Sequence, residues 1–225
     1  MAYLIGISGK KQSGKNTVAE FIATYFTENC NSRVGMYSFA NILKDTLVSL
    51  KLLTAAQAYG SDDQKNSSTR VRRVNAELLG IKFPPSNSQT FLTARELLQI
   101  VGTDILRLLW PDIWVHNTLN SIHEHFCSKQ SIVRRYDDGL VLIMDCRFRN
   151  EMHAIQGVGG KVIRLTRTPY NDTHISETQM DGIDNNYYDF VLDNANMTIE
   201  QQNSALEPIL EEWFKASRRE IRPYN

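Results

Sequence analysis

Residues 3–17 read YLIGISGKKQSGKNT, and this stretch decides the fold. A short apolar run ends at Ser8, and Gly9 and Gly14-Lys15 then stand at the spacing G-x-x-x-x-G-K. From Val18 onward, apolar side chains recur at the spacing of an amphipathic helix. Strand, glycine loop and helix are the context of a phosphate-binding loop, in which backbone N–H groups and the helix N-terminus converge on an anion.

The residues after Gly14 carry groups that suit a nucleotide phosphate and its metal ion. Lys15 supplies a mobile positive charge for the β- and γ-phosphates. Ser or Thr usually follows this lysine, whereas here Asn16 intervenes and the hydroxyl belongs to Thr17. The G-K-x-T form resembles nucleoside monophosphate kinases, and it leaves open whether Thr17 contacts Mg²⁺ directly or through water.

Length and composition restrict the class of protein. The chain has 225 residues, of which 42% are hydrophobic, which fits one α/β domain with an insertion, or two small lobes. Twenty-five basic residues balance 25 acidic ones, so net charge does not indicate nucleic acid or a membrane surface as partner. We expect no secretory leader and no membrane span. The three cysteines, Cys30, Cys127 and Cys146, lack metal-ligand spacing and favour a reducing cytosol.

Alternating strand and helix patterns predict an α/β fold of the P-loop NTPase type. Its doubly wound, mainly parallel five-stranded sheet would have helices on both faces. Further strands are expected at 32–39, 140–144, 160–165 and 187–192, and helices at 40–53, 93–109, 114–126 and near the C-terminus. A polar, substrate-binding insertion (54–92) would interrupt the core (1–53 and 93–225). The polar loop 167–186 is expected to act as a lid, because it has little apolar surface to bury.

Polar groups gather in three further places. The insertion carries a basic group that is either a solvated face or a substrate contact: Lys65, Arg70, Arg72 and Arg73. The expected helix 93–109, capped by Thr93 with Glu96, has a polar stripe that could hold a phosphate and a flat ring: Arg95, Gln99, Gly102 and Thr103. The apolar run 140–144 ends in Asp145-Cys146-Arg147, and ligands of open α/β sheets lie beyond the carboxyl ends of strands.

Four motifs in this order resemble a known enzyme family. They are the G-K-N-T loop, LLQIVGTD at 97–104, Asp145-x-Arg147-x-x-x-Glu151, and NDTHISE at 171–177. Together they make the chain similar to bacteriophage deoxynucleoside monophosphate kinases of the T-even phage type. The resemblance implies a single nucleotide kinase domain (1–225), ATP and a deoxynucleoside monophosphate (dNMP) as substrates, and Mg²⁺.

The resemblance also implies a role for each matched residue. ATP would contact Lys11, Ser13, Gly14, Lys15, Asn16 and Thr17, with Thr17 as the metal residue. The dNMP would contact Leu43, Lys44, Lys65, Arg95, Gln99, Gly102, Thr103, Trp114, Asp145, Arg147, Glu151 and Thr173, with Trp114 near the base. The catalytic residues would be Lys15, Asp145, Arg147 and Arg167, with Arg167 as a lid arginine.

Phosphoryl transfer requires this kind of residue set. It depends on positioning and on neutralising negative charge more than on acid–base groups. Lys15, Arg147 and Arg167 would act with Mg²⁺ on the phosphoryl oxygens. Asp145 is then expected to orient the substrate or a Mg²⁺-bound water rather than to act as a base.

The residues alone leave other functions open. The acceptor could be another small phosphorylated molecule, such as dephospho-coenzyme A or phosphomevalonate. A nucleotide-sensing or GTP-binding regulator is a second possibility, although no Asn-Lys-x-Asp guanine motif occurs. An ATPase without a second substrate is a third. The resemblance further implies a homodimer in a host bacterial cytoplasm, and we expect no nucleic acid or membrane partner.

Overall fold

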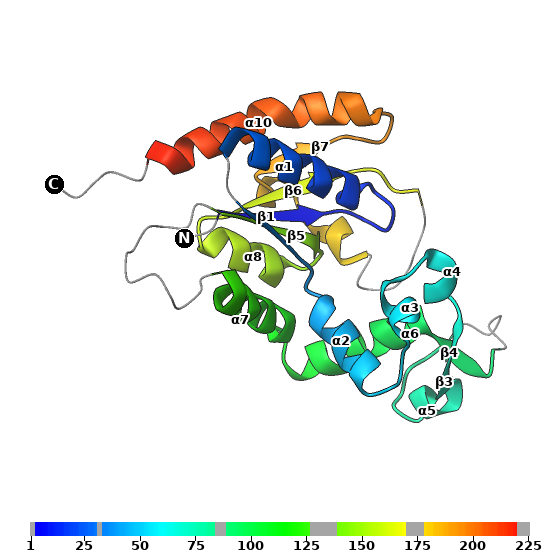
Figure 1. Ribbon diagram of the computed structural model, residues 1–225. Helices are drawn as coiled ribbons and strands as arrows, with labels where there is room; N and C mark the ends of the chain where they lie inside the picture. The colour runs from blue at the N-terminus through cyan, green and yellow to red at the C-terminus, as the bar shows by residue number, and fades with distance from the viewer. Residues whose placement is uncertain (1–2, 31–32, 84–88, 127–138, 170–177, 220–225) are drawn as a thin grey trace. The chain divides into compact units, whose positions relative to one another are not determined.

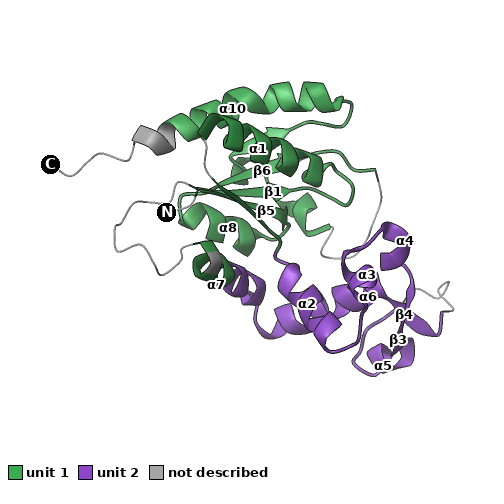
Figure 2. Cartoon of the chain, in the orientation of Figure 1, with its two compact units in different colours: residues 1–38, 119–225 green, residues 39–118 purple. Residues whose placement is uncertain are grey.

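The computed structural model describes residues 3–30, 33–83, 89–126, 139–169 and 178–219. The chain divides into two compact units, which have different colours in Figure 2. Unit 1 comprises residues 1–38 and 119–225, and unit 2 comprises residues 39–118. Each unit contains its own share of the candidate site residues.

Unit 1 is built on a five-stranded sheet with the strand order β2-β5-β1-β6-β7. All pairings between neighbouring strands are parallel. The strands are β1 (Tyr3–Ser8), β2 (Val34–Tyr37), β5 (Leu140–Cys146), β6 (Lys161–Leu165) and β7 (Phe190–Leu192). Because β1 lies in the centre, between β5 and β6, the loop after it lies where ligands bind in open α/β sheets.

Helices cover both faces of this sheet (Figure 1). On one face lie α1 (Lys15–Cys30) and α10 (Ile199–Arg219), and on the other lies α8 (Arg149–Gly157). Side chains alternate along β1, so Ile5 and Ile7 join the core with α1 and α10. A further helix, α7 (Ile113–Phe126), runs from unit 2 into unit 1. In the described part of the chain, no helix is long and apolar enough to cross a membrane.

The predicted fold class is confirmed. All five expected strands are present in a parallel sheet, and helices cover both of its faces. The bounds differ from the prediction: β5 continues two residues beyond the expected 140–144, whereas β2 spans only four residues of the expected 32–39. Apolar side chains continue past the last ladder hydrogen bond there, and a pattern of side chains does not show where backbone pairing stops.

Unit 2 consists of short elements. Its helices are α2 (Asn41–Ser49), α3 (Ala55–Tyr59), α4 (Asp62–Lys65), α5 (Arg73–Glu77), α6 (Ala94–Gln99) and the π-helix η1 (Ile100–Arg107). Its strands, β3 (Ser68–Arg72) and β4 (Phe91–Thr93), pair antiparallel. Capping boxes begin three of the helices, at Thr54, Ser61 and Thr93. The box at Thr93 with Glu96 is the one expected from the sequence.

A partly buried ion pair joins Arg73, which directly follows β3, to Glu96 on α6. Arg73 Nη2 lies 3.0 Å from both carboxylate oxygens of Glu96, and the guanidinium lies 4.2 Å from the ring centroid of Phe83. Glu96 also accepts a hydrogen bond from the Thr93 backbone N–H at 2.9 Å. Arg73 is 5% exposed. It is therefore a structural residue, and the expectation that places it on a solvated or substrate-facing surface is wrong.

The expected helix 93–109 is only partly correct. An α-helix occupies 94–99, and a π-helix follows over 100–107. A π-helix bonds residue i to residue i+5, so a stripe drawn at the α-helical spacing does not continue through it. Unit 2 is also larger than the predicted insertion 54–92, because α2 and the residues up to 118 pack with it.

Candidate functional site

The phosphate loop (residues 9–15) connects β1 to α1 by a tight turn. Gln12 and Gly14 both have positive φ angles, of +57° and +97°. At position 14 the residue is glycine, which adopts such a conformation without strain. The Ser13 N–H donates to the Lys10 carbonyl at 3.1 Å, and the Val18 N–H donates to the Gly14 carbonyl at 3.0 Å. The first N–H groups of α1 therefore lie at the loop, where their partial positive charge favours an anion.

The side chain of Lys15 folds back over the loop. Its Nζ donates to the carbonyl oxygens of Gly9 and Lys10 at 2.7 and 2.6 Å. The charge is thereby held beside the loop's own backbone. Lys10 extends elsewhere and forms an ion pair with Asp181 at 2.8 Å.

Two hydroxyl groups near the loop, those of Ser13 and Thr17, make no hydrogen bond in the described part of the chain. Ser13 is fully buried, and its Oγ has no hydrogen-bond partner among the described residues. Leaving a buried polar group unpaired costs about 1–3 kcal/mol, so a ligand atom at this position would remove a penalty. Thr17 is half-buried on the first turn of α1, and its hydroxyl makes no hydrogen bond in the described part of the chain. These oxygens fit a phosphate and a hard cation such as Mg²⁺.

A carboxylate lies at the end of the neighbouring strand. Ser8, the last residue of β1, pairs with Cys146 at the end of β5, so Asp145 is adjacent to the strand that leads into the loop. Ser38, which follows β2, donates its hydroxyl to Asp145 Oδ2 at 2.5 Å. Asp145 is therefore held at the carboxyl end of the sheet, where the sequence predicted it.

The motif Asp145-x-Arg147-x-x-x-Glu151 forms a helix start. Glu151 Oε2 accepts the backbone N–H groups of Arg147 and Phe148 at 2.7 and 3.0 Å. Glu151 is 1% exposed. Its carboxylate thus fixes the turn that presents Arg147, whose side chain is half-buried. A direct contact of Glu151 with dNMP stays a prediction.

Arg167 follows β6, and a buried asparagine organises it. The Arg167 guanidinium donates to the carbonyl oxygens of Asn194 and Met197 at 3.1 and 2.9 Å. Its backbone N–H donates to Asn194 Oδ1 at 3.0 Å. The amide of Asn194 also reaches the phosphate loop, donating to the Ser13 carbonyl at 2.9 Å. The predicted lid arginine and the loop therefore share one partner.

The second half of the predicted lid packs on unit 1. Two short 3-10 helices occupy this part, η2 (Gln179–Gly182) and η3 (Asn185–Tyr187). Met180 and Ile183 are 3% and 4% exposed, so the premise that this loop has little apolar surface to bury is wrong here. The sequence did not indicate this burial, because Met180 and Ile183 are only two apolar residues within a long polar stretch. Residues 170–177, with Thr173, lie outside the described residues, and lid closure stays a prediction.

In unit 2, Leu43, Gly102 and Trp114 form one packed group. A Cβ added to Gly102 would lie 2.5 Å from Leu43 Cδ2, which is too close, so the glycine allows α2 to approach the π-helix. The indole N–H of Trp114 donates to the Gly102 carbonyl at 3.0 Å, and Trp114 is 6% exposed. Trp114 therefore supports the π-helix. Its predicted contact with a base stays a prediction.

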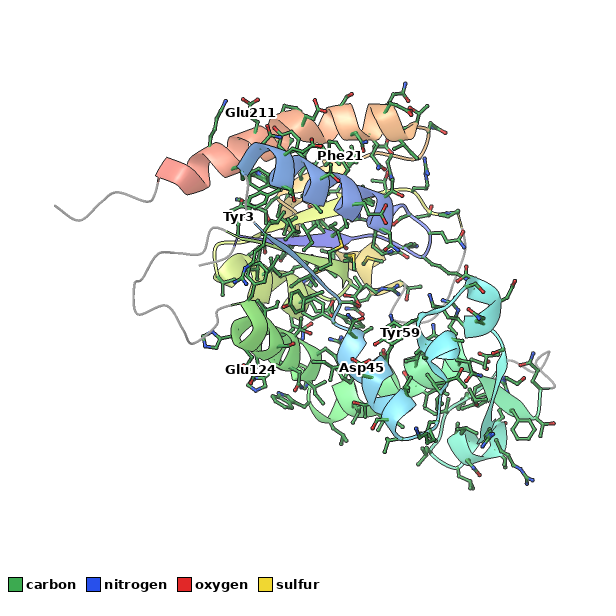
Figure 3. All side chains as sticks on the ribbon, in the orientation of Figure 1. Tyr3, Phe21, Asp45, Tyr59, Glu124 and Glu211 are labelled. Atoms are coloured by element: carbon green, nitrogen blue, oxygen red, sulfur yellow. The ribbon has the colours of Figure 1, made fainter. Side chains whose placement is uncertain are left out.

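Lys44 lies beside an aromatic ring on α3. Its Nζ is 5.1 Å from the ring centroid of Tyr59. The Tyr59 hydroxyl donates to Asp45 Oδ1 at 2.6 Å, and both residues are labelled in Figure 3. Burial and the hydrogen bond to Asp45 raise the pKa of Tyr59 above its ordinary value, so the hydroxyl stays a donor that links α3 to α2.

Residues at both ends of α4, Asp62 and Asn66, orient the side chain of Arg95. Its Nη2 donates to Asp62 Oδ1 at 2.7 Å, and its Nε donates to Asn66 Oδ1 at 3.0 Å. Arginine has five N–H donors, and Nη1 makes no hydrogen bond in the described part of the chain. Lys65 lies between these two partners in sequence, and its side chain forms no hydrogen bond or ion pair within the described ranges.

The predicted residues thus fall into two sets. Unit 1 brings together the phosphate loop, Asp145 and Arg167, and unit 2 brings Leu43, Gly102 and Trp114 together. Gln99 and Thr103 are half-buried, and their side chains make no hydrogen bonds where the chain is described. Lys11 is half-buried and Asn16 is exposed at the loop. Three supporting residues were not predicted from the sequence: Asn194, Asp62 and Tyr59. For Asn194 the only signal in the sequence was its position just after an expected strand.

Comparisons with known proteins show the family to which the chain belongs. The family model described as deoxynucleotide monophosphate kinase matches residues 36–205. The phosphate loop precedes that match, so the loop and the family model are separate observations. A crystal structure of the protein APE1195 has a TM-score of 0.35 and 14% identity, with 94% of this chain and 96% of that chain covered. That likeness is too weak to carry an argument.

A relative from a virus is much closer in sequence. A protein of Acanthamoeba polyphaga mimivirus, whose name assigns it to the deoxynucleotide monophosphate kinases, is 33% identical over 203 residues. The alignment covers 88% of this chain and 91% of the relative. The family predicted from the four motifs is confirmed, whereas the T-even phage type stays a prediction. The chain is a phosphotransferase that belongs to the deoxynucleotide monophosphate kinase family.

Proposed function

We propose that unit 1 binds ATP through the phosphate loop and that unit 2 supplies the groups that bind the dNMP. One observation carries the donor assignment: the buried Ser13 hydroxyl, inside a G-x-x-x-x-G-K loop, has no partner among the described residues. A phosphate oxygen of ATP would accept its hydrogen bond. The N–H groups at the start of α1 would bind the same phosphates.

The proposed reaction forms a bond between an oxygen of the dNMP phosphate and the γ-phosphorus of ATP, while ADP leaves. The 5′-phosphate is already a nucleophile near neutral pH, so the chain needs no catalytic base. Lys15, Arg147 and Arg167 are the cations proposed to stabilise the charge on the transferred group. Asp145 keeps its position through Ser38 and stays an acceptor rather than a base.

Mg²⁺ fits the same residues. The Thr17 hydroxyl and the Asp145 carboxylate are hard oxygen donors, and we propose that they hold the ion directly or through water. When bound, Mg²⁺ would neutralise part of the phosphate charge. A titration of ATP affinity against Mg²⁺ for Thr17→Val would test this, since the variant should need more Mg²⁺ for the same affinity.

The acceptor assignment rests on free polar groups in unit 2. Arg95 has an unused Nη1, and Lys65 has an unpaired ammonium where the chain is described, so both suit a phosphate. Gln99 and Thr103 offer uncommitted hydrogen-bonding groups for a base or sugar. A homodimer and a cytoplasmic place of action, both drawn from the resemblance, remain parts of this proposal.

An acceptor panel tests the proposed function. ADP release would be measured with ATP and Mg²⁺ against each dNMP, each ribonucleoside monophosphate, dephospho-coenzyme A and phosphomevalonate. We expect fast release with at least one dNMP and only background release without an acceptor. Steady ATP hydrolysis that no dNMP changes would instead indicate an ATPase. Faster ADP release with another phosphorylated acceptor would show that the acceptor is not a dNMP.

A further inference from the structure

Asn194 is a fully buried polar residue for which neither the motifs nor the family assignment provides a role. It is 0% exposed and follows β7 in the loop that leads to α10. Its Nδ2 donates both protons, one to the Ser13 carbonyl at 2.9 Å and one to Gln202 Oε1 at 3.0 Å. Its Oδ1 accepts the Arg167 backbone N–H at 3.0 Å. One carboxamide thus joins the phosphate loop, α10 and the residue after β6.

The contact with Ser13 fixes the direction of one peptide group in the phosphate loop. A trans peptide is planar, and its C=O and N–H point in opposite directions. Because Asn194 holds the Ser13 carbonyl, the N–H of Gly14 must point away from Asn194. Gly14 has a φ of +97°, a conformation that glycine can leave easily, so the peptide would otherwise be free to turn.

The packing around Gly14 reinforces this constraint. A Cβ added to Gly14 would lie 3.6 Å from both Asn194 Nδ2 and Gln202 Oε1. The two side chains therefore lie directly against the glycine. Gln202, on α10, is 5% exposed and holds the second proton of the Asn194 amide. The loop is braced from the side of α10, which leaves its other side for an anion.

The same residue sets the start of the Arg167 segment. The Asn194 side chain accepts the Arg167 N–H, and its backbone carbonyl accepts the Arg167 Nε at 3.1 Å. Arg167 Nη2 donates a further hydrogen bond to the Met197 carbonyl at 2.9 Å. Any rotation of Asn194 would move both the Ser13 peptide and Arg167.

We propose that Asn194 is a positioning residue for the phosphoryl donor, which holds the Ser13–Gly14 peptide and Arg167 in the arrangement that binds ATP. The proposal rests on the proposed function, because it takes ATP as the ligand of the phosphate loop. Asn194 touches no reacting atom in this scheme. It acts through the loop backbone, and its loss changes donor binding before it changes acceptor binding.

The sharpest test is Asn194→Asp, which keeps the shape and replaces the donor NH₂ by an acceptor oxygen. That oxygen would face the Ser13 carbonyl and Gln202 Oε1, which also accept. The matched control is Asn196→Asp, two residues further in the same loop. Asn196 is exposed and makes no side-chain hydrogen bond in the described part of the chain. Both variants add the same charge at nearly the same place.

Calorimetry with ATP and Mg²⁺ gives the first readout. We expect the dissociation constant to rise about tenfold for Asn194→Asp, the size of an unmade buried hydrogen bond, and to stay within about twofold for Asn196→Asp. Steady-state kinetics with the preferred dNMP should show the KM for ATP rising while the KM for dNMP is unchanged. A merely structural role would lower thermal stability without this separation between the two substrates.

A second variant and a second measurement test the proposal even if Asn194→Asp does not fold. Gln202→Met removes only one acceptor of the Asn194 amide and should raise the ATP dissociation constant about threefold, which decides the matter if Asn194→Asp does not fold. Hydrogen exchange at residues 9–17 of the ligand-free protein should speed up in both variants and not in Asn196→Asp. Equal ATP affinity and equal exchange in all variants would overturn the proposal. If the wild type binds no ATP, the proposed function fails, and the exchange comparison still decides whether Asn194 braces the loop.

Discussion

The candidate residues of unit 1 and unit 2 are held in place by different means. In unit 1 the phosphate loop and Asp145 stand at the carboxyl ends of paired strands, so the sheet positions them, and Asn194 braces the loop from behind. In unit 2 the candidate residues lie on short helices and a π-helix, and side-chain contacts hold them, such as Arg95 with Asp62. Substitutions at the phosphate loop should therefore disturb the donor, and substitutions of the candidate residues in unit 2 should disturb the acceptor.

The largest effect is expected at Lys15. Replacing it by alanine removes the cation that the loop carbonyls of Gly9 and Lys10 hold. Loss of such a charge contact should cost about 3–4 kcal/mol of transition-state stabilisation, or roughly 10²–10³-fold in kcat. Steady-state kinetics measures this, with circular dichroism to show an intact fold.

The control for Lys15→Ala is Lys82→Ala. Lys82 is exposed in unit 2 and forms no ion pair where the chain is described. It should keep wild-type kinetics. A Lys15→Ala protein that folds and retains near-wild-type kcat would remove the basis for assigning the donor to unit 1.

Arg95→Ala should produce the largest selective loss on the acceptor side. Its unused Nη1 donors are proposed to bind the dNMP phosphate, and charge-assisted bonds of this kind contribute about 2 kcal/mol, or roughly 30-fold in affinity. Titration with dNMP measures the loss, while the affinity for ATP should change little. If ATP affinity falls equally, the division between the two units is wrong.

Arg72→Ala is the matched control for Arg95→Ala. Arg72 is exposed on β3 and has no ion pair within the described ranges. Its dNMP affinity should equal that of the wild type. Arg73, although next to it, would be an unsuitable control, because it is buried with Glu96 and its removal would destabilise unit 2.

Trp114→Phe should have a smaller effect on the same side. The substitution keeps an aromatic ring but removes the indole N–H that bonds the Gly102 carbonyl. One neutral hydrogen bond contributes about 1 kcal/mol, so we expect the KM for dNMP to rise about fivefold. Trp213→Phe, a buried change on α10 of unit 1, should leave that KM unchanged. Equal KM values for the two variants would show that the π-helix does not position acceptor residues.

The sequence predicted what depends on local patterns. Apolar runs marked all five strands of the sheet, and the capping box at Thr93 marked a helix start. The phosphate loop was predictable because strand, glycine spacing and helix follow one another within 15 residues or so, a span that local chemistry controls. Asp145 was predictable because strand ends collect ligands in this fold class.

The sequence did not predict features that depend on distant partners. Arg73 pairs with Glu96 across 23 positions, and Asn194 reaches Ser13 across 181. A search that assumes the α-helical period does not find the π-helix. The strand β3 is mostly polar and β4 has only three residues, so neither stands out in the sequence. Met180 and Ile183 are buried, and they contact Ser8 on β1 and Arg164 on β6, which are distant in sequence.

The smallest expected effect is a pH dependence of stability in unit 1. Burial alone would raise the pKa of Asp189, but hydrogen bonds from Gln156, Lys161 and the Val162 N–H outweigh it and hold the pKa below its ordinary value of 3.8. A lowered folded-state pKa means that the carboxylate stabilises the fold above the unfolded-state pKa and loses this contribution as the pH falls through the folded-state value.

Urea unfolding of wild type and Asp189→Asn, from neutral pH to below 3.8, measures that contribution. The gap in unfolding free energy between the two proteins should be widest at neutral pH and should shrink in acid, because protonated Asp189 resembles the amide. Asp63→Asn, at an exposed residue without a partner in the described part of the chain, should show no such gap. Because Asp189 joins the starts of β6 and β7, far along the strands from the phosphate loop, Asp189→Asn should keep wild-type KM values for both substrates. A gap that stays constant with pH would mean that packing, and not the charge, makes Asp189 stabilising.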